Sequence, residues 1–328
     1  MGEFDLIRRY FTRPPGPAPQ VVLGVGDDCA LLQPTPGMQW AISSDMLVEG
    51  RHFFADTDPA RLGHKALAVN LSDLAACGAR PVGFTLALAL PQADEAWLDA
   101  FSRGLLQLAD LHNCPLVGGD TTRGPLNICI TVFGEVPPGQ ALLRSGARPG
   151  DDIYVSGTLG DARLALAALQ GQIALPEALQ HAAQLRLEQP TPRVALGMAL
   201  RGVASAALDV SDGLLGDLGH LLKASGVGAR VDTEITINLI AANAYQESAG
   251  AYFDHILLQQ CALAGGDDYE LVFTAPAAGR DAVARASQTS ATPVTRIGQI
   301  ETQPGLRLVD AKGQVLDARR YASFDHFG

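Results

Sequence analysis

The sequence predicts a mixed α/β (α+β) protein of two domains, and three observations support this prediction. Short β-rich runs alternate with Ala- and Leu-rich stretches of helical periodicity. The chain has 328 residues, enough for two domains of ordinary size. Turn-forming residues gather at 137–139 and again at 149–152, so we place the boundary between domains 1–148 and 149–328.

The elements of the first domain follow from local patterns. Strands are expected at 40–47, at 83–90, near 116–117 and at 127–136. Asp58-Pro59 supplies an N-cap and a first-turn proline for a helix that reaches about Cys77. The next helix carries an apolar stripe that should face the core, formed by Trp97, Phe101, Leu105 and Leu108.

The second domain is expected to begin with a strand at 153–156 and a glycine turn at 157–160 that leads into a helix. A strand at 206–210, a helix from about Asp212 and a strand at 270–275 should follow.

Composition excludes several classes of protein. No apolar run reaches the ~18 residues of a membrane span, and the first twenty residues are unlike a signal peptide. Five scattered cysteines without a CxxC pair indicate a reducing compartment and no structural zinc. We therefore expect a cytoplasmic protein without a membrane partner. The formal charge of −11 also argues against a nucleic-acid partner.

Lysine is scarce, since only Lys65, Lys223 and Lys312 occur. Any phosphate bound here must be neutralised by arginine, backbone amides or metal ions. The sequence contains no GxxxxGK[ST] loop, no HRD or DFG set, no GxGxxG that opens a βαβ unit, no HExxH and no GxSxG. A hydrolase triad stays open, but nothing indicates one.

Aspartates instead recur at the ends of apolar runs, often beside glycine or serine. They stand in Gly26-Asp27-Asp28, Ser43-Ser44-Asp45, the helix around Asp73, Gly119-Asp120, Asp209-Val210-Ser211-Asp212 and Gly266-Asp267-Asp268. Carboxylate and hydroxyl oxygens suit magnesium, and adjacent glycines let backbone amides approach an anion. A single aspartate is most often a cap or turn residue, which we assign to Asp56 and Asp58 and which stays open for Asp212. The number of such sites favours metal-dependent phosphate chemistry.

A series of runs then occurs in a specific order: GVGDDCALL, AISSDMLVEGRHF, KALAVNLSDLAACGARP, LVGGDTTRGPL, LLRSGARPGD, ALDVSDGLLGDLGHLLKASGVGAR, GGDDYEL and the terminal FDHF. In this order they resemble the thiamine-monophosphate kinase family over nearly the whole chain, least at 170–190 and 276–300. The resemblance implies the two-domain fold of aminoimidazole ribonucleotide synthetase. Its N-terminal domain should bind ATP and magnesium and dimerise through its sheet, giving a homodimer, and its C-terminal α/β domain should complete the active site.

The resemblance also implies the roles of individual residues. Magnesium ligands are expected at Asp28, Ser43, Ser44, Asp45, Asp73, Asp120, Asp209 and Asp212. ATP contacts are expected at Gly119, Asp120, Arg144 and Ser211. Thiamine monophosphate contacts are expected at His52, Asp267 and Phe324. The family usually has Glu where Asp267 stands, so this carboxylate reaches one methylene less far, and Ser44 replaces the commoner threonine.

The activity that the resemblance implies is that of a thiamine-phosphate kinase. ATP, the co-substrate, should give its γ-phosphate in line to thiamine monophosphate with the help of several Mg²⁺ ions, making thiamine diphosphate. The acceptor phosphate is already ionised near neutral pH, because its second pKa is about 6, so no general base is expected.

Other interpretations stay open on the residues alone. His52 also fits a hydrogen-bonded surface histidine, Phe324 a packed terminus and Arg144 an ordinary ion pair, with Arg123 as the competing ATP contact. Two further enzymes of this fold group are alternatives: an ATP-dependent synthetase of the aminoimidazole ribonucleotide type and a selenophosphate synthetase. The latter would need a lysine beside Cys29, and none is near it in the sequence. A non-catalytic protein that binds divalent metal ions is the alternative from another class.

Overall fold

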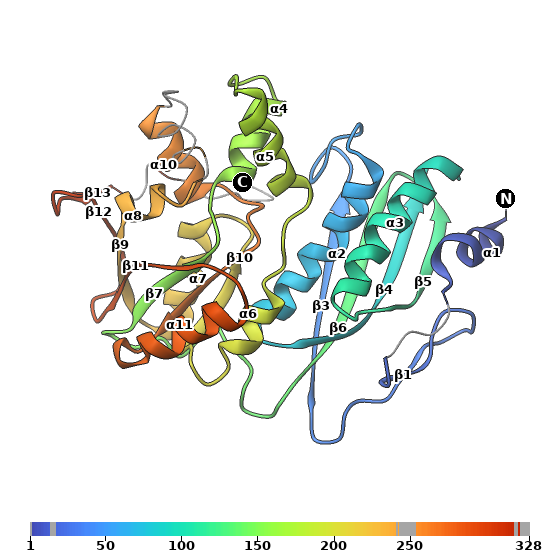
Figure 1. Cartoon of the computed structure of the whole chain (residues 1–328), viewed down its shortest axis with the longest axis horizontal. Coiled ribbons are helices and arrows are strands. Elements are labelled where there is room, and N and C mark those ends of the chain that lie inside the picture. The colour runs from blue at the N-terminus through green and yellow to red at the C-terminus, as the bar shows by residue number, and fades with distance from the viewer. Residues whose placement is uncertain (1, 14–17, 241, 243–253, 318–320, 322–328) are drawn as a thin grey trace. The chain divides into compact units, whose positions relative to one another are not determined.

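The computed structural model describes residues 2–13, 18–240, 242, 254–317 and 321, and it divides into two compact units (Figure 1). Unit 1 comprises Met1–Leu74 and Ala79–Ala141, and unit 2 comprises Ala75–Gly78 and Leu142–Gly328. Both units combine sheets with helices, so the predicted mixed α/β class is confirmed.

Unit 1 is built on a four-stranded sheet in the order β3-β6-β4-β5, in which β5 is parallel to β4 and the other pairs are antiparallel. Two helices lie over one face of this sheet (Figure 1). The strands are β3 (Gln39–Val48), β4 (Arg80–Leu90), β5 (Leu116–Arg123) and β6 (Asn127–Val136), and the helices are α2 (Pro59–Ala76) and α3 (Glu95–Leu111). They are preceded by α1 (Glu3–Leu6), a π-helical turn (Ile7–Phe11) and the pair β1 (Val21–Leu23) and β2 (Leu31–Leu32).

The two faces of the sheet differ in burial, as the period of a strand requires. Along β6, Ile128, Ile130 and Val132 are buried, whereas Cys129 and Thr131 between them are only half-buried. The buried set belongs to the face that α2 and α3 cover. The predicted apolar stripe of α3 packs there, with Phe101, Leu105 and Leu108 fully buried and Trp97 stacked on Phe101.

Unit 2 contains a seven-stranded sheet in the order β13-β12-β9-β11-β7-β10-β8. Its strands are β7 (Asp152–Ser156), β8 (Ala206–Val210), β9 (Gly228–Asp232), β10 (Glu270–Ala275), β11 (Val294–Glu301), β12 (Gly305–Val309) and β13 (Val315–Leu316). Its helices are α4 (Asp161–Leu169), α5 (Glu177–Glu188), α6 (Val194–Ala199), α7 (Leu214–Ser225), α8 (Thr233–Ile237), α10 (His255–Ala264) and α11 (Arg280–Thr289), with a 3-10 turn at Ala277–Gly279. Strands β7, β8 and β10 are buried along their whole length, and α7 packs its leucines on the core that they share.

Most elements expected from the sequence are confirmed, and the strands at 127–136, 206–210 and 270–275 match residue for residue. Two strands run further than expected: β3 continues to Val48 and β5 to Arg123. Asp120 therefore lies inside a strand and not after it, since ladder pairing continues through the polar residues of β5, whereas Asp45 lies inside β3 as expected. Among the described residues, no helix is both long enough and apolar enough to cross a membrane.

The helices α2 and α3 approach each other closely through glycines. A Cβ on Gly104 would lie 1.8 Å from the carbonyl oxygen of Ala60, and one on Gly63 would lie 2.1 Å from that of Phe101. These are backbone atoms of the facing helix, so a side chain at either position must push the helices apart.

We predict that Gly104→Ala lowers the free energy of unfolding by about 3 kcal/mol, because overpacking a well-packed interface forces the backbone to shift. Chemical denaturation measures the change. The control is Gly219→Ala in α7, where an added Cβ meets nothing within 4 Å. That substitution should stabilise the protein by up to about 1 kcal/mol through helix propensity. Equal effects of the two substitutions would contradict the close approach.

Candidate active site

Strand β3 distributes three predicted metal ligands over the two faces of its sheet, because neighbouring residues of a strand alternate. Ser43 and Asp45 lie on the side of α2: the Ser43 hydroxyl donates to Asp73 Oδ2, and the Asp45 amide donates to Asn70 Oδ1 at 3.1 Å. Ser44 lies on the other side, where its hydroxyl donates to the Ile130 carbonyl oxygen at 3.1 Å. The structure therefore gathers Ser43, Asp45 and Asp73 and separates Ser44 from them.

The Asp45 carboxyl is electrostatically unusual. Burial, and in second place the charge of the nearby Asp73, raise the pKa of Asp45 to about 6. The Asp45 and Asp73 carboxylates repel each other when both are ionised. A divalent cation between hard oxygen donors removes this repulsion, so the chemistry of the pair fits magnesium.

Asp120 and Gly119 lie on β5. Across the sheet, Asp120 lies beside Ala87 of β4, Ala87 beside Cys129 of β6, and Cys129 beside Met46 of β3. Met46 and Ser44 are two residues apart and share a face of β3, so Asp120 belongs to the side of Ser44. Gly119 has a φ of 145°, and a Cβ there would lie 1.9 Å from the Leu86 carbonyl oxygen, so only glycine fits.

Two further predicted residues of unit 1 lie in turns. Asp28 is exposed in the bend that follows β1, and its amide donates to Asp27 Oδ1 at 2.8 Å. His52 is half-buried, and its Nδ1 accepts the amide of Val48 at 3.0 Å. One ring nitrogen of His52 is therefore hydrogen-bonded to the backbone, as the alternative interpretation of this residue expected.

Unit 2 carries its predicted ligands at the end of β8. Asp209 is buried as the fourth residue of the strand, and Ser211 and Asp212 form the turn that leads into α7. Asp217 closes this turn: its Oδ2 accepts the backbone amides of Ser211, Asp212 and Gly213 at 3.0, 3.0 and 3.1 Å. The N-cap position of α7 is Gly213, which has no side chain to cap the helix, so the alternative that made Asp212 a simple cap is wrong.

Asp217 itself is almost completely buried. Burial is the largest influence on its carboxyl and raises its pKa to about 6, although the three amide donors act in the opposite direction. The group holds the turn that presents the Ser211 and Asp212 side chains.

The other predicted residues of unit 2 lie on loops. Ser225 Oγ donates to the Arg144 carbonyl oxygen and accepts the amides of Gly146 and Ala147, each at 3.2 Å, which fixes the segment that carries the exposed Arg144 side chain. Asp267 follows α10 and has a positive φ of 66°. Phe324 lies outside the described residues.

Within the part of the chain that the structure describes, no three His, Cys, Asp or Glu side chains gather closely enough to hold a metal ion by themselves. The oxygen nearest to this pair of acids that an interaction identifies is that of a neutral group, the Ser43 hydroxyl, which donates to Asp73. Sequence reasoning missed Asn70 and Asp217. Asn70 could have been noticed as a polar residue three positions before Asp73 in an otherwise apolar helix. Asp217 could have been noticed as an acid in the first turn of α7.

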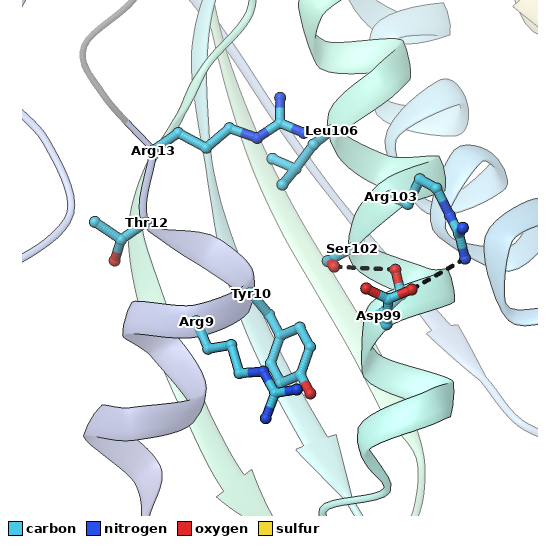
Figure 2. Close-up of a pocket in the computed structure, with 8 residues that line it drawn as sticks. All are labelled: Arg9, Tyr10, Thr12, Arg13, Asp99, Ser102, Arg103 and Leu106. Carbon is cyan, nitrogen blue, oxygen red and sulfur yellow. Dashed lines mark hydrogen bonds and ion pairs between the residues drawn. The ribbon is translucent and has the colours of Figure 1, made fainter.

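One pocket of unit 1, of about 400 Å³, is lined by none of these residues (Figure 2). Its three arginines are each paired with a carboxylate: Arg9 with Glu95, Arg13 with Asp110 and Arg103 with Asp99, at 2.9, 2.7 and 3.2 Å. The arginine charges are thus already balanced by the protein, and we assign no ligand to this pocket.

Comparison with known proteins places the chain in a family. Residues 26–136 match the family "AIR synthase related protein, N-terminal domain", and residues 148–311 match its C-terminal domain. A thiamine-monophosphate kinase of Salmonella typhimurium is 48% identical over 99% of this chain and 98% of its own length. The chain belongs to the thiamine-monophosphate kinase family. The member from Haemophilus influenzae is 41% identical over 100% of this chain and 98% of its own length.

Solved structures of this family agree with the fold. The thiamine-monophosphate kinase from Stenotrophomonas maltophilia K279a is 47% identical, with a TM-score of 0.83 over 92% of this chain and 93% of that one. AaThiL, solved in complex with AMPPCP and TMP, is 29% identical, with a TM-score of 0.74 over 90% and 89% of the two chains. The hydrogenase maturation protein HypE, at 21% identity, shares the fold alone.

We predict that Asp217→Ala lowers the free energy of unfolding by about 3 kcal/mol or more, because it leaves three amides of the Ser211–Gly213 turn without their acceptor. Denaturant titration measures the loss. Asp217→Asn is the matched variant: it keeps an acceptor oxygen at the same place and should cost about 1 kcal/mol. An alanine variant as stable as the asparagine variant would contradict the role of Asp217 in this turn.

Proposed function

We propose that the protein transfers the γ-phosphate of ATP to the phosphate of thiamine monophosphate, making thiamine diphosphate. The observation that supports this most strongly is the agreement over the full length with thiamine-monophosphate kinases at 41–48% identity. The complex of AaThiL with AMPPCP and TMP supports the same pair of substrates. The five cysteines all lie in the described residues and are free, which supports a cytoplasmic location.

The physical difficulty of this reaction is repulsion between two anions. Unit charges ~4 Å apart repel by about 4 kcal/mol at an effective dielectric constant of ~20, and several such pairs form when the acceptor phosphate meets ATP. Lysine cannot supply the missing positive charge, because the chain has only three lysines. The acceptor is already ionised near neutral pH, so the protein has to align the two phosphates and not to remove a proton.

We assign magnesium binding to Asp45 and Asp73 with Ser43, and to Asp28, Ser44 and Asp120 in the same unit. In unit 2 we assign it to Asp209 and Asp212. Bound Mg²⁺ neutralises phosphate charge and aligns the reacting groups. The Ser43 hydroxyl and the Asn70 amide orient this set from the strand and from α2.

The remaining roles follow the family positions. Gly119, Asp120, Arg144 and Ser211 are proposed to contact ATP. The Arg144 guanidinium can grip phosphate oxygens with two parallel hydrogen bonds, and its exposed side chain is compatible with this role. His52, Asp267 and Phe324 are proposed to contact thiamine monophosphate.

We predict that Asp45→Asn lowers kcat about 100-fold or more, because the amide keeps the size of the side chain but loses the charge that binds a cation. Turnover of thiamine monophosphate with ATP is measured over a range of magnesium concentrations. The second readout is the rise in melting temperature on adding magnesium, which should be smaller in the variant than in the wild type, because one of the proposed metal sites is lost.

Asp110→Asn is the control, since Asp110 is an exposed aspartate that pairs with Arg13 outside the proposed site. It should keep both the activity and the magnesium response. Wild-type activity of Asp45→Asn at limiting magnesium would refute the metal assignment, and a wild-type protein without turnover would refute the function.

We also propose that the protein is a homodimer formed through the uncovered face of the unit 1 sheet. This face carries Ile42 and Met46, which are 61% and 53% exposed. Trp40 and Phe133 lie on the same face and pack edge to face, with their ring centroids 6.5 Å apart. Contiguous exposed apolar surface of this kind usually marks an interface. The Ser44 hydroxyl on the same face is hydrogen-bonded within the sheet, to the Ile130 carbonyl oxygen at 3.1 Å and to the Thr131 hydroxyl at 2.9 Å.

We predict that Ile42→Lys converts the dimer into a monomer, because a lysine charge would be buried without a partner in the interface. Sedimentation at micromolar concentration measures the mass. Leu111→Lys is the control, since Leu111 is 74% exposed at the end of α3 and away from this face. A monomeric wild type, or a dimer in the Ile42 variant, would overturn the proposal.

A further inference from the structure

The segment 265–269 that joins α10 to β10 has an unusual backbone. Asp267 and Tyr269 have φ angles of 66° and 51°, in the left-handed region that residues other than glycine rarely adopt. Such conformations are energetically unfavourable and persist only where the surroundings hold them in place. This segment also carries the residue to which we assign thiamine monophosphate binding.

The surroundings of the segment fix it from both sides. The amides of Asp267 and Tyr269 donate to the carbonyl oxygens of Ser211 and Val210, both at 2.8 Å. Between them, the Asp268 side chain is buried, with its two carboxylate oxygens 2.9 and 3.0 Å from the amide nitrogen of Gly160. The backbone on each side of Asp267 is therefore held by hydrogen bonds to β8, to the turn after it and to the start of α4.

Buried charges reinforce this arrangement directly after Tyr269. Glu270 is fully buried, and both of its oxygens accept from Arg193 at 2.6 Å, while one also accepts from Arg186 at 2.7 Å. Arg186 donates in addition to the Asp268 carbonyl oxygen at 3.3 Å. Hydrogen bonds and ion pairs thus hold both ends of the segment, and they force Asp267 and Tyr269 into their left-handed conformations.

The consequence of the two left-handed residues is that the Asp267 and Tyr269 side chains meet while the intervening Asp268 points inward. The Tyr269 hydroxyl donates to Asp267 Oδ1 at 3.2 Å. A phenol held in this way restricts the rotation of the carboxylate. This matters more for Asp than for the longer Glu, because a short side chain cannot compensate for a wrong orientation by bending.

We propose that Tyr269 is a positioning residue, which orients the Asp267 carboxylate toward a hydrogen-bond donor of the thiamine monophosphate acceptor. The inference rests on the proposed function and goes beyond it by giving substrate specificity to a residue that does not itself touch the substrate. Loss of the hydroxyl should weaken binding of the acceptor and leave the ATP site unchanged.

The test is steady-state kinetics of Tyr269→Phe with both substrates varied. The Michaelis constant for thiamine monophosphate should rise about threefold to tenfold, as expected for a single hydrogen bond. The constant for ATP should stay within about twofold of the wild type, and so should kcat. Tyr154→Phe is the matched control, because the Tyr154 hydroxyl likewise donates to a carboxylate two residues away, Asp152, at 3.4 Å. That variant should leave both constants unchanged.

A double-mutant cycle with Asp267→Ala separates positioning from packing. If Tyr269 acts through Asp267, Tyr269→Phe does not raise the Michaelis constant for thiamine monophosphate any further once the carboxylate is gone. If the alanine variant does not fold, Asp267→Gly replaces it, because glycine accepts a positive φ without strain. An undiminished effect of Tyr269→Phe in this background, an equal rise in both Michaelis constants, or an unchanged constant for thiamine monophosphate overturns the inference alone. A wild type that does not phosphorylate thiamine monophosphate overturns the proposed function, and the inference with it.

Discussion

Two carboxylates, those of Asp45 on β3 and Asp73 on α2, lie close together where the helices of unit 1 meet its sheet. Burial and the charge of Asp73 both disfavour ionisation of Asp45, and the pKa rises to about 6. Folding alone gains nothing from such a pair, since like charges near each other destabilise the compact state. A divalent cation, which we propose this pair binds, would remove the repulsion and so connect the fold of unit 1 to metal-dependent chemistry.

The position of this pair depends on ordinary packing. Strand β3 presents every second residue to the helix-covered face, so Ser43 and Asp45 share that face and Ser44 does not. Helix α2 is held against α3 by the close approach at Gly63 and Gly104, and it carries Asn70 and Asp73 on the turns that reach β3. The charges of the site are therefore positioned by the close glycine-mediated packing of α2 against α3.

Many strands and helices could be predicted from the sequence, because the spacing of apolar residues along the chain differs between the two. The strand at 127–136 and the capped helix that begins at Pro59 are examples. Strands β9, β11 and β12 were not predicted. Each is short or mixed in burial, and β12 is stabilised by parallel pairing with β9, seventy-odd residues away in the chain. The division of Ser43 and Ser44 between faces follows from register, whereas the turn role of Asp217 depends on three amides that only the folded turn brings together.

What the oxygens of each aspartate accept distinguishes structural from functional acids in this chain. Asp94, Asp232 and Asp254 accept amides at the start of α3, α8 and α10, as helix caps do. At such positions asparagine would serve almost as well, because an acceptor is needed and a charge is not. Asp73 accepts a serine hydroxyl instead and faces a second carboxylate, an environment in which the negative charge raises the free energy of the protein alone. An acid that persists where its charge is unfavourable needs a reason outside folding, and binding of a cation by the folded protein is the reason that its chemistry supports.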